Sequence, residues 1–185
     1  MPGIACAQKP NTPPPDGADP VFSSLFYKPY EAAAQSALQL LDNSRAILQA
    51  QTGENPVRSM TFRLKSPASI RDKLSKKGIP ASSAAACSAL RDIAGLRVIL
   101  TTEEAVYRFA DLIRKSPTCE YLCSHDYIAA PKPSGYRSLH LLLRIPVCLQ
   151  AQAYMVPVEI QLRTYPMDVW ASIEHAACYK PTLRA

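Results

Sequence analysis

The chain has 185 residues, of which 48% are hydrophobic and 19% are charged, and its formal net charge is +6. This length suits one domain with a real core, and the modest charged fraction argues against a coiled coil or a disordered acidic tail. The positive charge favours an anionic partner, and nucleotide phosphates, nucleic acid and membrane headgroups all fit this description.

Targeting features are missing from the sequence. No apolar run approaches the roughly 20 residues that span a bilayer, and the first residues lack the basic and apolar regions of a signal peptide. The six cysteines follow no framework spacing, so we interpret them as reduced core residues. We therefore expect a cytoplasmic protein without membrane contact.

The N-terminal third changes composition once. Residues 1–20 carry six prolines and little to bury, which predicts a disordered Pro-rich arm. Apolar residues then recur at helical spacing, which predicts a long amphipathic helix over 21–50. A strand is expected at 60–65, followed by a helix over 69–77 that ends at Gly78.

In the rest of the chain, predicted helices and strands first alternate, and three strands then follow one another. A short helix at 82–90 is expected to lead into a buried strand at 96–100 and a helix at 103–115. Three strands and a helix follow, at 121–128, 138–145, 156–163 and 166–179. Clustered strands with helices outside them predict an α+β fold with a mixed sheet of about five strands.

A basic cluster lies between residues 58 and 77, with seven cations against one acid. Arg63 and Lys65 are two apart and so share one face of the predicted strand. Ser69 and Lys73 are four apart and so form one stripe on the helix that follows. If the two elements abut, the cations converge on one spot that suits a polyphosphate. A solvated helix face is the alternative.

Two carboxylates stand beside predicted strands. Asp92 precedes an apolar strand, and Glu159 shares the polar face of its strand with Gln161 and Arg163. Carboxylates from separate strands could share a Mg²⁺, which takes one or two carboxylates together with phosphate oxygens. An edge strand that faces solvent is the alternative.

The segment D-Y-I-A-A-P-K-P-S-G-Y-R-S-L-H (126–140) predicts a loop between two strands. It supplies charge, a flat ring and hydrogen-bond donors in Lys132, Tyr136, Arg137 and His140. An aromatic ring beside cations suits stacking on a base while the phosphates are held. An ordinary hairpin with a turn tyrosine is the alternative.

These segments, in this order, resemble the synthetase domain of the RelA/SpoT homologue family, specifically its small alarmone synthetases. The matching stretches are R-L-K-S-P-A-S-I-R-D-K (63–73), D-I-A-G-L-R-V-I (92–99), the 126–140 segment, and V-E-I-Q-L-R-T-Y-P-M-D-V-W-A-S-I-E-H-A-A-C-Y-K (158–180). The resemblance implies a nucleotidyltransferase-like synthetase domain over 21–185. It also implies an enzyme that moves the β,γ-diphosphate of ATP to the ribose 3′-hydroxyl of GDP or GTP. The products would be AMP and (p)ppGpp, the alarmone of the stringent response.

The resemblance also assigns roles to residues of this sequence. On the donor side, Arg63 and Arg97 would sandwich the adenine of ATP, and Lys65, Ser69 and Lys73 would hold its phosphates. Asp92 and Glu159 would bind Mg²⁺, and Glu159 would also take the proton from the 3′-hydroxyl. On the acceptor side, Tyr136 would stack on guanine, and the residues around the acceptor nucleotide would be Lys132, Arg137, His140 and Gln161.

Several positions depart from the family pattern. His125 stands where a Lys or Arg is usual and is expected to weaken phosphate or metal handling near neutral pH. Phe62 stands where a small residue is frequent and is expected to narrow the adenine pocket. Relatives form a tetramer through further C-terminal helices, whereas this chain stops five residues after Lys180. We expect either a truncated sequence or a different homo-oligomer.

Two other functions stay open at this level. Related pyrophosphokinases act on adenine nucleotides or on the 3′ end of tRNA, and a tyrosine stacks on any purine. RNA binding is compatible with the charge, but the cations concentrate in the expected ATP motif rather than in a separate patch. A non-catalytic nucleotide- or RNA-binding module would be expected to lack Asp92, Glu159 or Tyr136, and all three are present.

Overall fold

The computed structural model describes residues 22–178. Its first element, α1 (Ser24–Thr52), follows the apolar spacing predicted for a long helix and buries one stripe of side chains. The helix ends at Gly53, whose φ of 78° is left-handed and whose N–H donates to the Gln49 carbonyl oxygen at 2.8 Å. The proposed arm at 1–20 lies outside the described residues.

Within residues 22–178, the four remaining helices are shorter, and three of them begin at a side-chain cap. They are α2 (Pro67–Lys76), α3 (Ser83–Ala89), α4 (Glu103–Arg114) and α5 (Tyr165–Cys178). Ser66 caps α2 by accepting from the Ser69 N–H, and Pro67 occupies the first turn, where its missing N–H costs nothing. As predicted, α2 gives way to Gly78, which has a φ of 69°.

Five strands form one sheet in the order β1-β2-β5-β4-β3. They are β1 (Val57–Leu64), β2 (Ala94–Leu100), β3 (Glu120–Asp126), β4 (Leu139–Leu149) and β5 (Gln152–Thr164). β2 and β5 run parallel, whereas all other neighbours are antiparallel. This arrangement confirms the predicted α+β fold with a mixed five-stranded sheet.

The hairpin between β4 and β5 is longer than the sequence predicted. We expected a connection from 146 to 155, but both strands continue through it to a two-residue turn. Gln150 and Ala151 form that turn with φ values of 50° and 63°, the left-handed geometry that suits tight hairpins. Pro146 begins the stretch that the prediction left out, because proline usually interrupts a ladder, yet it pairs with Met155 in register here.

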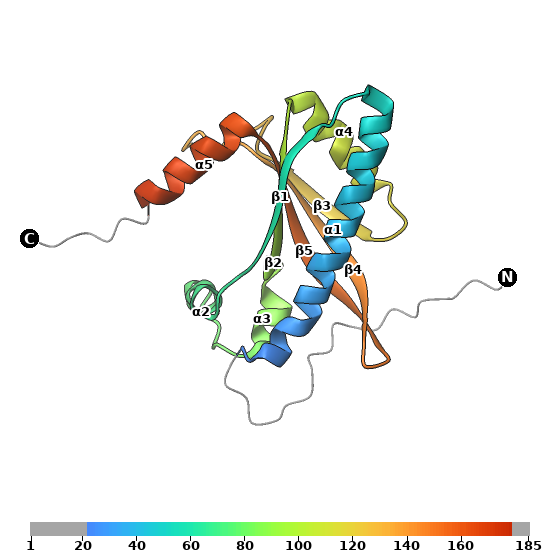
Figure 1. Ribbon diagram of the computed structural model, residues 1–185. Coiled ribbons are helices and arrows are strands. Elements are labelled where there is room, and N and C mark those ends of the chain that lie inside the picture. The colour runs from blue at the N-terminus through green and yellow to red at the C-terminus, as the bar shows by residue number, and fades with distance from the viewer. Residues whose placement is uncertain (1–21, 179–185) are drawn as a thin grey trace, which may run out of the picture.

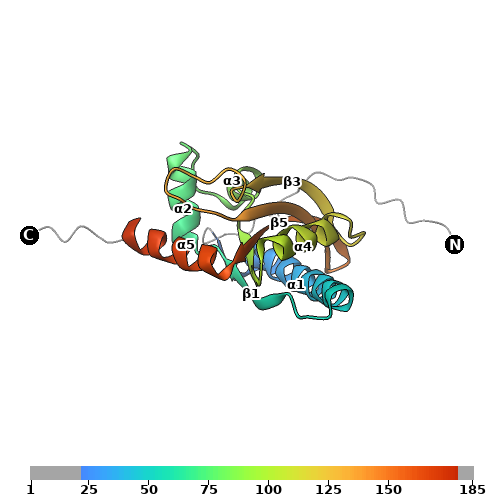
Figure 2. The same ribbon diagram turned by 90° about the horizontal axis from the view of Figure 1, so that it is seen from above.

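Helices cover one face of the sheet. In Figures 1 and 2, α1 and α4 lie on the same side of it. Val158, Ile160 and Leu162 of β5 are buried in one core cluster with residues of both helices. The alternate residues of β5 point to the opposite face, as the polar–apolar alternation of this strand predicted. α5 leaves the end of β5 and extends away from the sheet (Figure 1). Among the described helices, none combines the length and the apolar character needed to cross a membrane.

Candidate functional site

A row of polar residues crosses the sheet face that α1 and α4 leave open. Gln161 in β5 lies opposite Arg97 in β2 on one side and opposite His140 in β4 on the other. Glu159 lies two residues before Gln161 in β5, on the same face of the strand and opposite Gly95. Directly paired residues share a face of the sheet, so β-pairing alone gathers side chains that are far apart in the sequence.

A cavity of about 290 Å³ opens beside this row, at the β1 edge of the sheet. Six of the predicted site residues line it, and they are Arg63, Lys65, Asp92, Arg97, Glu159 and Gln161. The cavity is open above Gly95, because a Cβ added there would find only the Arg63 carbonyl oxygen, at 3.8 Å. Phe62 also lines the cavity and is 47% exposed, consistent with the expectation that it narrows this pocket.

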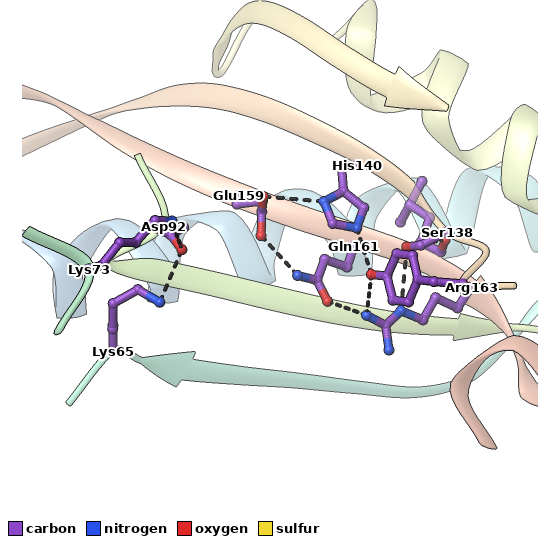
Figure 3. Close-up of polar contacts among 10 residues, drawn as sticks. Lys65, Lys73, Asp92, Ser138, His140, Glu159, Gln161 and Arg163 are labelled. Atoms are coloured by element: carbon purple, nitrogen blue, oxygen red, sulfur yellow. Dashed lines mark hydrogen bonds and ion pairs between the residues drawn. The ribbon is translucent and has the colours of Figure 1, made fainter. Parts of the chain in front are cut away.

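Asp92 receives two lysines at one end of the cavity (Figure 3). Its Oδ2 atom lies 3.0 Å from the Lys65 Nζ atom and 2.7 Å from the Lys73 Nζ atom. The predicted convergence of strand and helix cations is therefore confirmed for these two lysines. The other oxygen of Asp92, Oδ1, is buried without a hydrogen-bond partner in the described part of the chain. A buried carboxylate oxygen in this state fits a cation, because an unsatisfied charged group is costly.

Ser69 lies in the first turn of α2, and its polar groups contact the neighbouring Ser66. Its Oγ atom lies 2.9 Å from the Ser66 Oγ atom, and its N–H donates to the same hydroxyl. Ser69 is exposed and is not among the residues that line the cavity. Its hydroxyl stays one helical turn from Lys73, on the stripe that the sequence predicted.

Glu159 accepts hydrogen bonds at both oxygens. His140 Nδ1 lies 3.2 Å from Oε1, and Gln161 Nε2 donates to Oε2 at 2.8 Å. Burial by itself raises the pKa of this carboxyl, but the hydrogen bond and charge of His140, the Gln161 amide and the charge of Lys73 outweigh it. The pKa of Glu159 is lowered to about 2. The carboxylate is therefore ionised at neutral pH.

The Tyr136 ring is only 9% exposed. It meets the rings of Tyr127 and His140 edge-on, and its hydroxyl lies 2.8 Å from the His140 Nε2 atom. Two cations lie over the ring, with Lys132 Nζ at 4.8 Å and Arg163 Cζ at 5.1 Å from its centroid. Stacking of a base on this ring therefore requires a neighbouring side chain to move.

Two other residues of the same region make different contacts. Arg137 forms an ion pair with Glu103 at the start of α4, with an Nη2–Oε1 distance of 2.9 Å, and does not line the cavity. His125 stacks on Tyr127 with ring centroids 6.2 Å apart and lies opposite His140 in the β3–β4 register. The structure thus brings Tyr136 and His140 to Glu159, but it leaves Arg137 at the α4 end of the loop.

Three residues that hold the site together had no role assigned from the sequence: Arg163, Asp168 and Trp170. Arg163 and Arg97 both contact Asp168 Oδ1, at 3.1 and 3.2 Å. Trp170 donates from Nε1 to the Ser134 carbonyl oxygen at 3.2 Å, which fastens α5 to the loop that carries Tyr136. The alternation along β5 already placed Arg163 on the same face as Glu159, so the sequence did contain a signal for Arg163. The contacts of Asp168 and Trp170 depend on how α5 packs.

Comparison with known proteins adds to this geometry. Residues 62–183 match the family described as "Region found in RelA / SpoT proteins", which covers most of the chain. The chain belongs to the RelA/SpoT family. The matched residues include all five strands of the sheet except the first five residues of β1.

Three similar proteins illustrate the family. GTP pyrophosphokinase YwaC of Bacillus subtilis (strain 168) is 37% identical over 148 residues, which is 78% of this chain and 70% of that protein. The small alarmone synthetase 1 of Bacillus subtilis bound to its product pppGpp is 32% identical, with a TM-score of 0.77, over 87% of this chain and 81% of that one. The same synthetase bound to AMPCPP is 26% identical, with a TM-score of 0.68, over 84% and 76% of the two chains.

Proposed function

We propose that this chain transfers the β,γ-diphosphate of ATP to the ribose 3′-hydroxyl of GDP or GTP, forming (p)ppGpp and releasing AMP. One observation carries the proposal most directly: Asp92 and Glu159 line the same cavity as three cationic side chains, and Glu159 is linked through His140 to the Tyr136 loop. Two carboxylates, a phosphate-binding cluster and an aromatic ring are the parts that diphosphate transfer between nucleotides needs. The relatives named GTP pyrophosphokinase and the pppGpp-bound synthetase support the same reaction.

ATP is proposed to occupy the cavity at the β1 edge. Arg63 and Arg97 present planar guanidinium groups, which stack well on an adenine ring. Lys65 and Lys73 lie at the other end of the cavity. On ATP binding, their ammonium groups would leave Asp92 and contact the phosphates instead. Ser69, one helical turn from Lys73, would contribute its hydroxyl to the same phosphates.

Asp92 and Glu159 are proposed to hold Mg²⁺. The unpartnered Oδ1 atom of Asp92 supports this assignment. No group of three or more His, Cys, Asp or Glu side chains within residues 22–178 forms a metal cage of its own. Mg²⁺ is usually held by one or two carboxylates together with substrate phosphates and water, so two carboxylates suffice. Bound there, the ion would neutralise charge on the triphosphate.

The proposed reaction is a substitution at phosphorus. The 3′-oxygen of the acceptor attacks the β-phosphorus of ATP, and the bond from that phosphorus to the α,β-bridging oxygen breaks with its electron pair on AMP. Glu159 takes the proton of the 3′-hydroxyl. The low pKa of Glu159 keeps the carboxylate ionised and therefore able to accept this proton.

Tyr136 is proposed to stack on the guanine ring. Lys132 contacts the ring in the structure described here, and a base that displaced it would release an ammonium group for the acceptor phosphates. His140 and Gln161 flank Glu159 and would face the acceptor ribose. Arg137 would reach the acceptor only by leaving Glu103, so it is the weakest member of this set.

We also propose that the enzyme works in the cytoplasm. Among the described residues, Cys119, Cys123 and Cys148 are reduced thiols, which suits a reducing compartment. Homo-oligomer formation stays a prediction, as does the division into an arm and one synthetase domain.

The function is tested by incubating the purified chain with γ-³²P-labelled ATP, Mg²⁺ and one acceptor at a time. The acceptors are GDP, GTP, GMP, ADP and deacylated tRNA, and the products are separated by thin-layer chromatography or gel electrophoresis. Labelled product from GDP or GTP is expected. Label in ADP or tRNA without label in guanine nucleotides would reject the proposed acceptor, and no transfer to any of them would reject the activity.

A further inference from the structure

Arg163 is a charged side chain that is almost completely buried. It is 4% exposed and lies at the end of β5, just before α5 begins. A buried guanidinium is stable only when its donors are satisfied. Here Nη1 contacts Asp168 Oδ1 at 3.1 Å, Nη2 donates to the Tyr136 hydroxyl at 2.6 Å and to Gln161 Oε1 at 2.7 Å, and Nε donates to Ser138 Oγ at 3.4 Å.

The contact with Gln161 orients that side chain. Arginine has donors and no acceptor, so the group facing it must be the amide oxygen of Gln161. The amide nitrogen then faces the other way, and it donates to Glu159 Oε2 at 2.8 Å. Arg163 therefore fixes which end of Gln161 meets Glu159.

The contact with Tyr136 orients a second chain of hydrogen bonds. The Tyr136 oxygen accepts from Arg163 and lies 2.8 Å from His140 Nε2. The ionised Glu159 only accepts, so the His140 Nδ1 atom, 3.2 Å from Oε1, must carry a proton. The Nε2 atom on the other side of the ring then faces the Tyr136 hydroxyl. Both chains begin at Arg163 Nη2 and end on the two oxygens of Glu159 (Figure 3).

Asp168 connects this network to the cavity. The same Oδ1 atom that holds Arg163 also holds Arg97 Nη1 at 3.2 Å. Arg97 lines the cavity proposed for ATP, whereas Arg163 contacts the tyrosine proposed for guanine. One carboxylate at the start of α5 therefore joins the two sides of the site.

We propose that Arg163, held by Asp168, is a positioning residue that orients Gln161 and His140 so that both donate to Glu159. This inference rests on the proposed function, because Glu159 is the base of that reaction. Arg163 lines no part of the cavity and acts through other side chains rather than on substrate. Its loss leaves the ATP pocket in place but leaves Glu159, Tyr136 and His140 free to adopt other rotamers.

The kinetic test uses three variants and one control. Arg163→Lys keeps the charge but loses the planar fork, Tyr136→Phe keeps the stacking ring but breaks one chain, and Asp168→Asn keeps an oxygen acceptor without the charge. Arg144→Lys is the control, because Arg144 is an exposed arginine of the same sheet that forms an ion pair with the exposed Glu120. Thermal unfolding shows which variants fold.

We expect kcat to fall about 10–100-fold for Arg163→Lys, as happens when partners that orient a functional group are removed. KM for ATP should change by no more than about threefold, because the binding contacts to ATP remain. Tyr136→Phe and Asp168→Asn should lower kcat in the same direction, and Arg144→Lys should match the wild type. Should Arg163→Lys and Tyr136→Phe both keep the wild-type kcat, Arg163 has no positioning role.

A second readout needs no catalysis. The chain has three histidines, so ¹⁵N NMR with a His140→Asn variant for assignment can report the ring state of His140. We expect a proton on Nδ1 in the wild type, where it faces Glu159, and loss of that fixed state in Tyr136→Phe. A wild-type ring without a proton on Nδ1 would overturn the network. An inactive wild type would instead reject the proposed reaction, so the two failures are distinguishable.

Discussion

Lys132 Nζ lies 4.8 Å from the centroid of the Tyr136 ring. The ring proposed to bind guanine is therefore already engaged by a cation, and only 9% of Tyr136 is exposed. Lys132 is exposed, and a cation–π contact at an exposed site is worth about 0.5–1 kcal/mol. A base must replace that contact, so Lys132 and guanine compete for one surface.

Tyr136→Ala is expected to weaken GDP binding by about 1–3 kcal/mol, the usual effect of removing a stacking ring from a nucleobase site. Affinity for a non-hydrolysable ATP analogue should stay within error, because Tyr136 does not line the ATP cavity. Isothermal titration calorimetry measures both affinities. Tyr121→Ala is the control, since Tyr121 is an exposed tyrosine on β3. A loss confined to the ATP analogue would contradict the assignment.

Glu159→Gln is expected to lower turnover by about 10²–10⁴-fold, because an unassisted hydroxyl is a poor nucleophile. Binding of the ATP analogue should be mostly retained, as the amide fills the same space. Single-turnover assays with labelled ATP and GDP measure the rate. Glu120→Gln removes an exposed carboxylate of the same sheet and should have no effect. Unchanged turnover in Glu159→Gln would remove Glu159 from its role.

The low pKa of Glu159 predicts how stability depends on pH. The pKa falls from its ordinary value of 4.5 to about 2 in the folded chain. The carboxylate therefore adds stability above its unfolded pKa, and this contribution is lost as pH falls from 4.5 towards 2. Urea unfolding between about pH 5 and pH 3 should show a steeper loss of the free energy of unfolding in wild type than in Glu159→Gln. Parallel curves would show that Glu159 has no shifted pKa.

Removal of the metal should stop the reaction. EDTA is expected to abolish transfer, and Asp92→Asn should raise the Mg²⁺ concentration needed for half-maximal rate by about tenfold or more, because it removes one of two proposed ligands. Rates measured across a Mg²⁺ series test this. Asp111→Asn, at an exposed ion pair on α4, is the matched control. A metal dependence of Asp92→Asn equal to that of wild type would place the ion elsewhere.

Gly135 provides a test of the contact between α5 and the Tyr136 loop. Its φ is 82°, and a Cβ there would lie 3.3 Å from the Trp170 ring. Gly78 has a similar φ of 69° with nothing within 4 Å of an added Cβ, so it is a matched control for backbone strain alone. Both Ala variants should lose about 1–2 kcal/mol of stability, the cost of a left-handed residue with a side chain.

Only Gly135→Ala should also weaken GDP binding, because only there must Trp170 move. Trp170 is the single tryptophan of the chain, so its fluorescence reports the displacement directly. Calorimetry with GDP provides the affinity. Equal GDP affinity in the two glycine variants, with unchanged fluorescence, would show that the contact does not position the loop.

Much of the fold follows from periodicity. Apolar residues at helical spacing predicted α1, and alternation along 156–163 predicted both the strand and the polar face that carries Glu159. The β4–β5 hairpin was underestimated because Pro146 interrupts the pattern locally, whereas the ladder on either side of it holds both strands in register. In such cases the cooperative pairing of two long strands outweighs the local preference of a single residue against a strand.

The sequence alone determined which residue types are available and which face of each element carries them. Arg63 with Lys65, and Glu159 with Gln161, share a face because side-chain direction repeats every second residue along a strand. Only the tertiary structure decided which of these faces meet. Register across β2, β5 and β4 put Arg97, Gln161 and His140 side by side, and the packing of α5 put Asp168 against two arginines. Such contacts join residues distant in the sequence, so spacing along one chain carries no record of them.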